Sequence, residues 1–271
     1  MPGRDLDLLI DAARAAGRIA HGFWRQSPET WDKPGGAGPV TAADLAVDRM
    51  LKEELRAARP DYGWLSEETP DDPARLAHDR CFIVDPIDGT RAFIEGDTSF
   101  AHALAVAEGG RVTAAVVYLP ERDALYAATE DGPATLNGKP IAAAQPDHAG
   151  GATVLTSAST LAPEHWAGRT PPPVRRVFRA SFAWRLCLVA EGRFDATLTL
   201  RPSWEWDIAA GDLIARRAGA TVTDRSGAGL RFNRPDPRAD GVIAAGGALW
   251  QVLQGGLATP GSQPPTLRKT L

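Results

Sequence analysis

The sequence contains little that suggests disulfide, membrane or nucleic-acid chemistry. It has only two cysteines, Cys81 and Cys187, which stand in apolar runs without a Cys-x-x-Cys partner and so predict buried free thiols. No stretch approaches the roughly 20 continuous apolar residues that a membrane span requires. The formal net charge of −4 excludes a protein that binds nucleic-acid polymers through a basic surface.

Groups for covalent catalysis are also scarce. The five histidines are scattered, and no Gly-x-Ser-x-Gly motif or paired Cys and His occurs, so the sequence predicts no covalent intermediate. The N-terminus turns acidic too early for a secretory signal or a transit peptide. We therefore expect a cytoplasmic protein whose chemistry does not depend on a Ser, Cys or His nucleophile.

The composition is that of an ordinary globular chain. With 271 residues, of which 44% are hydrophobic and 24% charged, it suits one large domain or two closely joined ones. Apolar residues at steps of three and four predict a helix over residues 9–23, capped by Asp5 or Asp7. The same pattern predicts a second helix between Thr41 and Pro60.

The order of the remaining elements predicts a mixed fold. Short strand candidates at residues 62–66 and 81–84 are each followed by acidic residues, and from residue 99 to about 141 strand-like runs alternate with turn signals, as in an antiparallel meander. After about residue 150 strands alternate with helices, which favours an α/β arrangement. We therefore expect an α+β and α/β fold with three parts, namely residues 1–150, residues 151–256 and a mobile tail over residues 257–271.

The most informative stretch is the segment Asp-Pro-Ile-Asp-Gly-Thr over residues 85–90. A strand here ends in two carboxylates, and a Gly-Thr pair with a helix start follows directly. Carboxylates bind a hard divalent cation such as Mg²⁺, and free backbone N–H groups at a helix start accept a phosphate. The simpler alternative is a turn in which Asp85 and Asp88 act only as caps and Gly89 supplies a positive φ.

A related motif belongs to the haloacid-dehalogenase phosphatases, which use Asp-x-Asp-Gly-Thr with the first Asp as nucleophile. Here the residue two positions before Asp88 is Pro86, so the spacing is one residue too long. Those enzymes also usually carry the motif on the first strand of the chain. Both differences disfavour that mechanism for this sequence.

Three further acidic elements stand at the ends of predicted strands or helices. Glu67 and Glu68 follow the first short strand, Asp207 opens an apolar helix, and Asp44 comes three residues after Thr41. Each has a structural alternative: a surface pair for the glutamates, an N-cap for Asp207 and a capping box for Asp44. The residues alone leave these alternatives open.

Together these segments resemble the motifs of a known family. Phe-x-x-Asp-Pro-Ile-Asp-Gly-Thr-x-x-Phe (residues 82–93) and Trp-Asp-x-Ala-Ala-Gly (residues 206–211) are similar to the two signatures of the inositol monophosphatase superfamily. That superfamily includes inositol monophosphatases, 3′(2′),5′-bisphosphate nucleotidases, histidinol-phosphatases and, more distantly, fructose-1,6-bisphosphatases. The acidic residues at 40–44 and 66–68 fall where the family has its other two acidic elements. The resemblance covers roughly residues 5–250 and implies the layered α-β-α-β-α sugar-phosphatase fold.

The resemblance also implies a metal site and the chemistry that goes with it. Two or three Mg²⁺ ions would lower the pKa of a water molecule and neutralise the leaving oxygen of a phosphate ester. Inhibition by Li⁺, which could occupy one of the Mg²⁺ positions, is a further implication. The implied ligands are Glu67, Asp85, the backbone carbonyl of Ile87, Asp88 and Asp207, with Asp85 bridging two ions.

Other residues receive catalytic and phosphate-binding roles from the same resemblance. Thr90, paired with Asp44, would help to activate the water, and Glu67 would lie near it. The N–H groups of Gly89, Thr90 and the residues that follow would hold the phosphate. Members of the family vary in their use of the residue at Glu68, so its role stays open.

Substrate choice depends on three features that lean toward the bisphosphate nucleotidases. Arg91 precedes Ala-Phe-Ile, Ser181 begins a helix that ends in Val-Ala-Glu-Gly, and Glu205 stands two residues before Asp207. These three residues are candidate substrate contacts, although Arg91 could equally be a solvated helix residue.

We expect a small phosphorylated metabolite as substrate and a monomer or homodimer as the active species. Hydrolysis of 3′-phosphoadenosine 5′-phosphate comes first among the expectations. An inositol-1-monophosphatase or a broad sugar-phosphate phosphatase comes second, and a histidinol-phosphatase third. A non-catalytic, metal-binding relative is the alternative from another class of protein.

Overall fold

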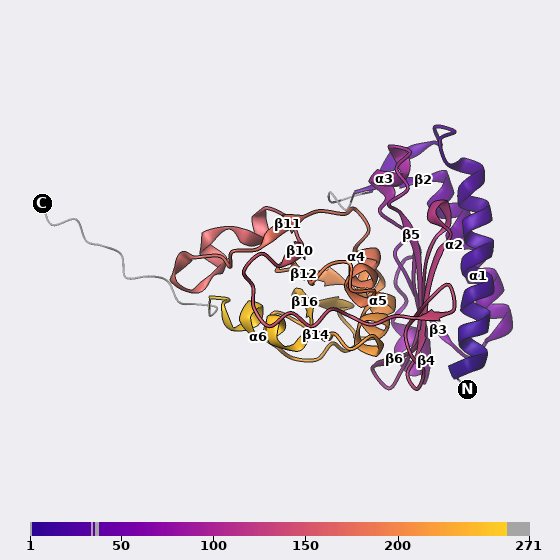
Figure 1. Ribbon diagram of the computed structural model, residues 1–271. Coiled ribbons are helices and arrows are strands. Elements are labelled where there is room, and N and C mark those ends of the chain that lie inside the picture. Colours follow the sequence, from indigo (N-terminus) through magenta and orange to yellow (C-terminus); the bar gives the residue numbers. More distant parts are fainter. Residues whose placement is uncertain (1, 34, 36–37, 259–271) are drawn as a thin grey trace, which may run out of the picture.

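Helices and sheets of the molecule are stacked in alternating layers (Figure 1). The structure is a computed structural model and describes residues 2–33, 35 and 38–258. Helices α1 (Pro2–Phe23) and α2 (Ala42–Ala58) cover the outer face of a seven-stranded sheet. Helices α4 (Phe182–Ala190) and α5 (Glu205–Arg217) separate that sheet from a five-stranded one, which α6 (Gly247–Gly255) covers on its far side. The predicted α-β-α-β-α layering is confirmed.

The first sheet brings the ends of β3 and β4 to one edge. These two strands pair in parallel with Ser66 opposite Val84, whereas all other neighbours in the sheet are antiparallel. The predicted meander is therefore confirmed. In order across the sheet the strands are β3 (Gly63–Ser66), β4 (Arg80–Asp88), β5 (Ala101–Glu108), β6 (Arg111–Leu119), β7 (Ala124–Thr129), β8 (Thr135–Leu136) and β9 (Lys139–Pro140).

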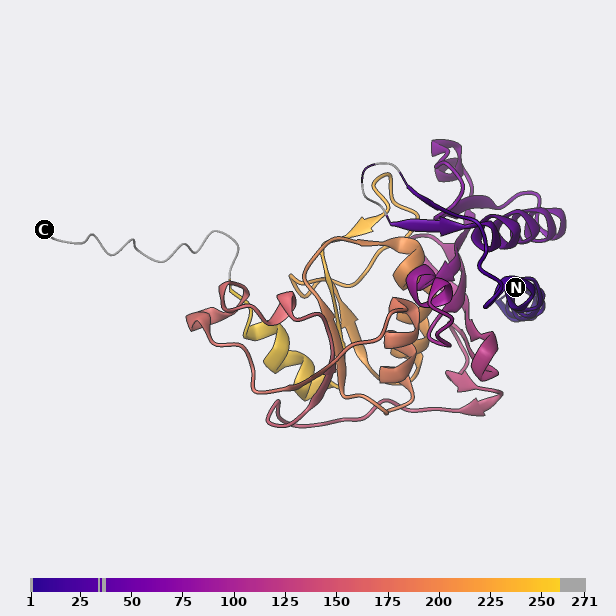
Figure 2. The same cartoon turned by 90° about the horizontal axis from the view of Figure 1, so that it is seen from above.

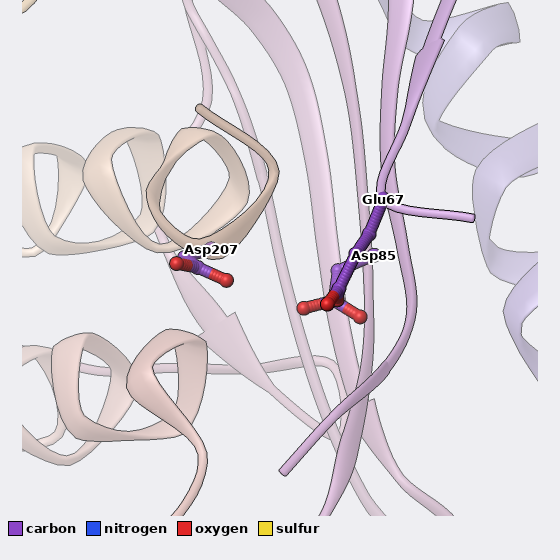
Figure 3. A group of neighbouring side chains, drawn as sticks. All are labelled: Glu67, Asp85 and Asp207. Carbon is purple, nitrogen blue, oxygen red and sulfur yellow. The ribbon is translucent and has the colours of Figure 1, made fainter. Parts of the chain in front are cut away.

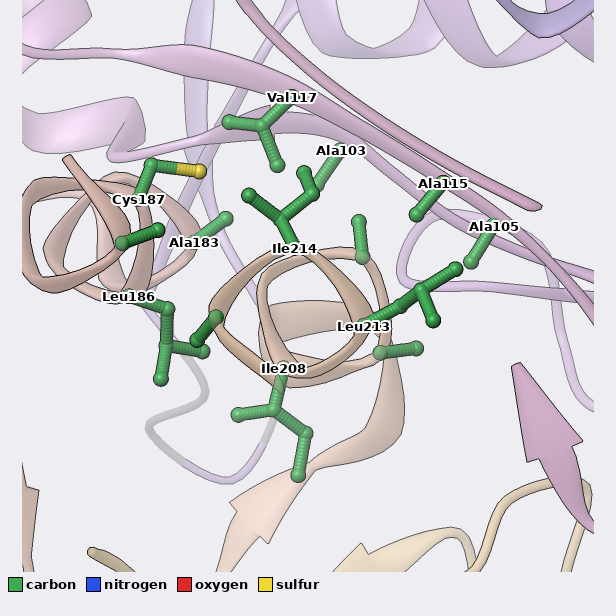
Figure 4. Packing of buried hydrophobic residues seen from close by; sticks show 14 of the residues in the cluster. Ala103, Ala105, Ala115, Val117, Ala183, Leu186, Cys187, Ile208, Leu213 and Ile214 are labelled. Carbon is green, nitrogen blue, oxygen red and sulfur yellow. The ribbon is translucent and has the colours of Figure 1, made fainter. Parts of the chain in front are cut away.

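Both faces of this sheet are covered, which explains why its strands are almost continuously apolar. Along β5, for example, Ala103 packs with α4 and α5, whereas the next residue, Leu104, packs with α1 and α2. Figure 4 shows Leu213 and Ile214 of α5 directed toward the small residues of the sheet. Alanine side chains on that face let α5 lie close to the sheet, and this proximity carries the N-terminus of α5 to the edge where β3 and β4 end.

The second half contains the predicted alternation of strands and helices. Strands β11, β10 and β12 are parallel, and β16 runs antiparallel between β12 and β14. A division near residue 150 stays a prediction, because α4 and α5 contact strands of both sheets. The strands are β10 (Thr153–Leu155), β11 (Arg175–Val177), β12 (Ala196–Thr199), β14 (Thr221–Thr223) and β16 (Val242–Ala245).

Helix α1 begins earlier than predicted, so neither Asp5 nor Asp7 is its N-cap. Asp5 is buried and accepts hydrogen bonds from Arg59 Nε at 2.9 Å and from the Tyr62 hydroxyl at 3.1 Å, which ties α1 to the end of α2. A buried carboxylate needs such partners, and an arginine 54 residues away in the sequence was not a visible candidate. The expectation that Asp5 or Asp7 caps α1 was therefore wrong.

Short elements complete the fold (Figure 2). The predicted tail is partly ordered, because Leu257 pairs with Trp166 and the N–H of Ala258 donates to the His165 carbonyl; residues 259–271 lie outside the described part. No described helix is both long and apolar enough for a transmembrane segment. The short elements are α3 (Thr90–Ile94), β1 (Thr30–Asp32), β2 (Pro39–Thr41), β13 (Ser203–Trp204), β15 (Arg238–Ala239) and the 3-10 turns η2 (Pro73–Ala77), η3 (Pro120–Arg122), η4 (Ser159–Leu161), η5 (Pro163–His165) and η6 (Ala167–Arg169).

Candidate active site

Two acidic residues meet because β3 and β4 are parallel neighbours. Glu67 is the first residue after β3, and its backbone N–H donates to the Val84 carbonyl at 3.3 Å, one residue before Asp85. Parallel strands end at the same edge of a sheet, so the register places Glu67 beside Asp85.

Helix α5, which packs against one face of the seven-stranded sheet, supplies the third carboxylate. Asp207 lies in the first turn of α5, whose N-cap is Trp204, so Asp207 does not cap the helix. Carboxylate oxygens of Glu67, Asp85 and Asp207 lie within 4.8 Å of one another. Figure 3 shows the side chain of Asp207 reaching from the helix toward the other two. Separations of this size suit oxygen ligands of one cation.

Asp88 lines the same cleft, and hydrogen bonds from the start of α4 fix its carboxylate. One carboxylate oxygen, Oδ2, accepts hydrogen bonds from Ser181 Oγ and from the Ala183 N–H, both at 2.6 Å. The side chain shares a cavity wall with Glu67 and Asp207. Ser181 itself is fully buried and also caps α4, so in this structure it supports Asp88, and a substrate contact there stays a prediction.

Asp85 is the most buried member of the acidic cluster, and among the described residues no positively charged side chain pairs with it. Asp85 is 1% exposed, and its Oδ1 atom has no hydrogen-bond partner among the described residues. Burial, followed by the charges of Glu67, Asp88 and Asp207, raises the pKa of Asp85 well above its usual range. A buried carboxylate with an orphaned oxygen and acidic neighbours is stabilised by a bound cation, so the donor set fits a divalent metal.

Sequence reasoning missed the lysine that contacts this cluster. The Lys33 ammonium donates to Glu67 at 2.7 Å and to Glu68 at 2.6 Å. Burial raises the pKa of Glu68 to about 7 even with this partner. Lys33 directly follows β1 and precedes a Pro/Gly-rich stretch of sequence, and nothing in its local sequence marks it as a partner of the two glutamates.

Asp44 serves two neighbours, one with each carboxylate oxygen. Its Oδ2 accepts from the backbone N–H and the hydroxyl of Thr41, at 2.8 Å and 2.5 Å, and so completes the capping box of α2. Its Oδ1 accepts from the Thr90 hydroxyl at 3.2 Å. Burial raises the pKa of Asp44 to about 6. The capping box is thus present, and so is the pairing of Asp44 with Thr90 that the family resemblance implied.

The turn after β4 orients the remaining groups of the motif. Pairing with β5 is interrupted between Asp85 and Asp88, which frees the carbonyl of Ile87, and the Thr90 hydroxyl lies 3.1 Å from that carbonyl. Gly89 has φ +100°, and a Cβ atom there would lie 3.1 Å from the Ser99 carbonyl oxygen. This position therefore requires glycine.

A second missed residue holds the segment that carries the two glutamates. Asp48 of α2 accepts from the Ser66 hydroxyl at 2.5 Å and from the Thr69 hydroxyl at 2.8 Å. These bonds clamp both ends of the segment that contains Glu67 and Glu68. The spacing from Thr41 assigns Asp44 to the helix cap but gives Asp48 no role, so its contacts with Ser66 and Thr69 are visible only in the fold.

The cleft continues away from the acidic cluster as a cavity of about 820 Å³. Gly89, Thr90 and Arg91 line it, and their contact with a substrate stays a prediction. Glu205 does not line it: it is 1% exposed, and it accepts hydrogen bonds from the N–H groups of Asn233 and Arg234 at 2.6 Å and 3.1 Å. In this structure Glu205 therefore binds backbone groups of residues 233 and 234, and a substrate contact there stays a prediction.

Comparison with known proteins supports the resemblance seen in the sequence. The model of the inositol monophosphatase family matches residues 4–262. An inositol-1-monophosphatase from Rhizobium meliloti is 33% identical, with 92% of this chain and 96% of that protein covered. A fructose-1,6-bisphosphatase/inositol-1-monophosphatase from Thermotoga maritima is 32% identical, with 82% and 85% covered. The solved structure of an IMPase from Thermotoga maritima superimposes with a TM-score of 0.81, at 28% identity and with 93% and 96% covered.

Proposed function

Because this chain belongs to the inositol monophosphatase family, we propose that it hydrolyses inositol 1-phosphate or a related sugar phosphate with the help of Mg²⁺. As a member of that family it is a metal-dependent phosphomonoesterase. The observation that carries the proposal is the cluster of Glu67, Asp85 and Asp207 within 4.8 Å, with the deepest oxygen of Asp85 unpaired.

The relatives favour the second of our sequence-based expectations over the first. The two curated relatives described above carry inositol-1-monophosphatase in their names, and one of them is also a fructose-1,6-bisphosphatase. We therefore place inositol and sugar monophosphates ahead of 3′-phosphoadenosine 5′-phosphate as substrates. Two of the features that favoured the nucleotidase, Ser181 and Glu205, are buried and hydrogen-bonded within the chain, which supports the same order.

The proposed metal ligands surround the end of β4. They are the carboxylates of Glu67, Asp85, Asp88 and Asp207 and the carbonyl of Ile87, and they would hold two or three ions. When bound, Mg²⁺ supplies the positive charge that lowers the pKa of a water molecule and offsets charge on the leaving oxygen. Ser181 and the N–H of Ala183 keep Asp88 in place by occupying its Oδ2 atom.

The proposed path of the proton starts at Thr90. Its hydroxyl has a single proton, which can go to Asp44 Oδ1 or to the Ile87 carbonyl. When Asp44 accepts that proton in a hydrogen bond, the Thr90 oxygen presents a lone pair to a water in the cleft. Glu67 would lie on the other side of this water, and Glu68, paired with Lys33, would adjust the charge around it.

The substrate phosphate would occupy the part of the cleft beside Gly89. Gly89, Thr90 and Arg91 line that part of the cavity, and the backbone N–H groups of Gly89 and Thr90 would donate to the phosphate there. Hydrogen bonds from backbone N–H groups are well suited to phosphate oxygens, since their donors are fixed by the turn. Arg91 is exposed, so it would add charge at the rim of the site.

A phosphate-release assay with Mg²⁺ tests the proposal. We expect release from inositol 1-phosphate, and the comparison panel is 3′-phosphoadenosine 5′-phosphate, histidinol phosphate and fructose 1,6-bisphosphate. Omission of Mg²⁺, or excess EDTA, should abolish release. Absence of phosphate release from every member of the panel, with Mg²⁺ binding intact, would instead favour the non-catalytic, metal-binding alternative.

A further inference from the structure

Strand β4 is irregular at the point where it carries the proposed metal ligands. Asp85 pairs with Ala103 of β5, and Asp88 pairs with Ala101. Three steps along β4 thus face two steps along β5, so β4 contains a bulge of one extra residue. Pro86 is buried in this bulge and has no partner in the register, so its carbonyl needs a hydrogen-bond donor from elsewhere.

His102, which stands in β5 opposite the bulge, supplies that donor. Its Nδ1 atom lies 2.5 Å from the Pro86 carbonyl oxygen. A carbonyl oxygen only accepts hydrogen bonds, so the contact requires a proton on Nδ1. His102 is 0% exposed, and burial lowers the pKa of its imidazole to about 4, which leaves the ring neutral at pH 7. The bond to Pro86 therefore specifies one tautomer, with Nδ1 protonated and Nε2 not.

The second ring nitrogen shows that packing alone does not account for a histidine here. Nε2 is buried and has no hydrogen-bond partner among the described residues. The ring lies among aromatic side chains, with centroid distances of 6.2 Å to Phe100 and 6.5 Å to Tyr118. A phenylalanine in such surroundings would avoid the cost of an unpaired nitrogen. What histidine supplies and phenylalanine lacks is the bond to the bulge.

From this arrangement we infer that His102 is a positioning residue, which fixes the bulge that carries Ile87 and Asp88. The inference rests on the proposed function, which assigns both residues as Mg²⁺ ligands. Mg²⁺ requires nearly octahedral oxygen ligands at about 2.0–2.1 Å, so a small displacement of the bulge weakens its binding. The start of α4 holds Asp88 on one side of the sheet, and His102 holds the bulge from the face that α1 and α2 cover.

The competing explanation is that His102 only fills space in the core between the sheet and the outer helices. Two substitutions separate the explanations because they have opposite properties. His102→Phe fills the space but has no donor, whereas His102→Asn leaves a gap but keeps an N–H donor close to the place of Nδ1. If His102 only packs, Asn is the more harmful substitution in every measurement. If His102 positions the bulge, Phe is the more harmful one for Mg²⁺ binding.

The experiment measures Mg²⁺ affinity by calorimetry and Tm in EDTA, both without substrate. We expect His102→Phe to weaken Mg²⁺ binding by roughly 10- to 100-fold and His102→Asn by less than about 3-fold. In EDTA the order should reverse, with the lower Tm in His102→Asn. The matched control is Thr113→Val, which removes a buried bond to the Val106 carbonyl elsewhere in the same sheet and should leave Mg²⁺ affinity within about 3-fold of the wild type.

NMR spectroscopy of the wild type tests the bond without relying on a folded His102→Phe variant. In protein labelled with ¹⁵N in histidine and kept in EDTA at pH 7, the ring of His102 should show the Nδ1–H tautomer, identified by its loss in His102→Asn. The Nε2–H tautomer, or Mg²⁺ affinity in His102→Phe equal to that of the wild type or above that of His102→Asn, would overturn the assignment. Absence of phosphate release from a wild type that binds Mg²⁺ would refute the proposed function alone.

Discussion

Replacement of Asp85 by Asn should have opposite effects on stability and on catalysis. Oxygens of Glu67, Asp85 and Asp207 lie within 4.8 Å of one another, and two unit charges at that distance repel by about 3.5 kcal/mol at an effective dielectric constant of about 20. Asp85 takes part in two of the three pairs. Partial proton uptake relieves some of this repulsion at neutral pH, since burial and these neighbours raise the pKa of Asp85. We therefore expect Asp85→Asn to increase the free energy of unfolding in EDTA by about 1–4 kcal/mol.

Addition of Mg²⁺ should reverse the order of stability. A wild-type protein at 100 times the dissociation constant gains about 2.7 kcal/mol, or roughly 5–10 °C in Tm for a chain of this size. The variant lacks the charge of the deepest ligand and should gain little. Its kcat should fall by about 10²–10³-fold, because this is the usual loss for one charge-stabilising group.

The assay is urea unfolding followed by circular dichroism, in EDTA and in a Mg²⁺ series, together with phosphate release. Asp212→Asn serves as control. Asp212, which lies on α5, is buried like Asp85, but it is paired with Arg216 at 2.8 Å. The control should lose stability by a few kcal/mol with or without Mg²⁺. If Asp85→Asn is less stable than the wild type in EDTA, or gains as much from Mg²⁺, Asp85 is a structural cap and the reasoning is refuted.

Four other predictions follow from the site. Asp44→Asn and Thr90→Ala should each lower kcat by about 10²–10⁴-fold, and the double variant should lower it hardly further, because the two side chains act as a unit. If Asp44→Asn lowers Tm but leaves kcat intact, Asp44 acts only as a helix cap. Asp48→Asn should weaken Mg²⁺ binding by roughly 10-fold, measured by calorimetry, since it releases the segment that carries Glu67; unchanged affinity would contradict this. Li⁺ should inhibit phosphate release at fixed Mg²⁺ where the same concentration of Na⁺ does not, and equal responses would count against the site. Burial raises the pKa of Glu205 to about 7, so its contribution to stability is complete below about pH 4.5 and is lost as the pH rises through 7. Urea unfolding at pH 5 and 8 should show that Glu205→Gln removes roughly 3 kcal/mol of the pH dependence of the unfolding free energy. The same pH dependence in both proteins would refute this.

Much of the site could be predicted because its elements are local in the sequence. The capping box of Thr41 and Asp44 spans three residues, and the turn after Asp88 depends on one glycine with a positive φ. The strand that ends at residue 88 and the helix that carries Asp207 both appear in the apolar pattern. Such features depend on neighbouring residues alone, so a single sequence contains the information needed to place them.

The direction of individual side chains was less predictable. Ser181 and Glu205 stand in segments that resemble the family, yet one supports Asp88 from behind and the other binds the N–H groups of residues 233 and 234. Asp5 begins a helix pattern but pairs with Arg59. In each case a buried polar group takes the nearest available partner, and that partner is chosen by packing rather than by spacing in the chain.

The sequence by itself determined the helices, the strands and the four acidic elements, because apolar periodicity and short motifs are encoded residue by residue. The resemblance of those motifs then implied the family and its layered fold. Tertiary structure alone decided which groups meet. The parallel register of β3 and β4 sets Glu67 beside Asp85, packing of α5 on the alanine-rich sheet face delivers Asp207, and a loop brings Lys33 to a glutamate 34 residues away. Long-range contacts of this kind depend on strand register and layer packing, which no local pattern specifies.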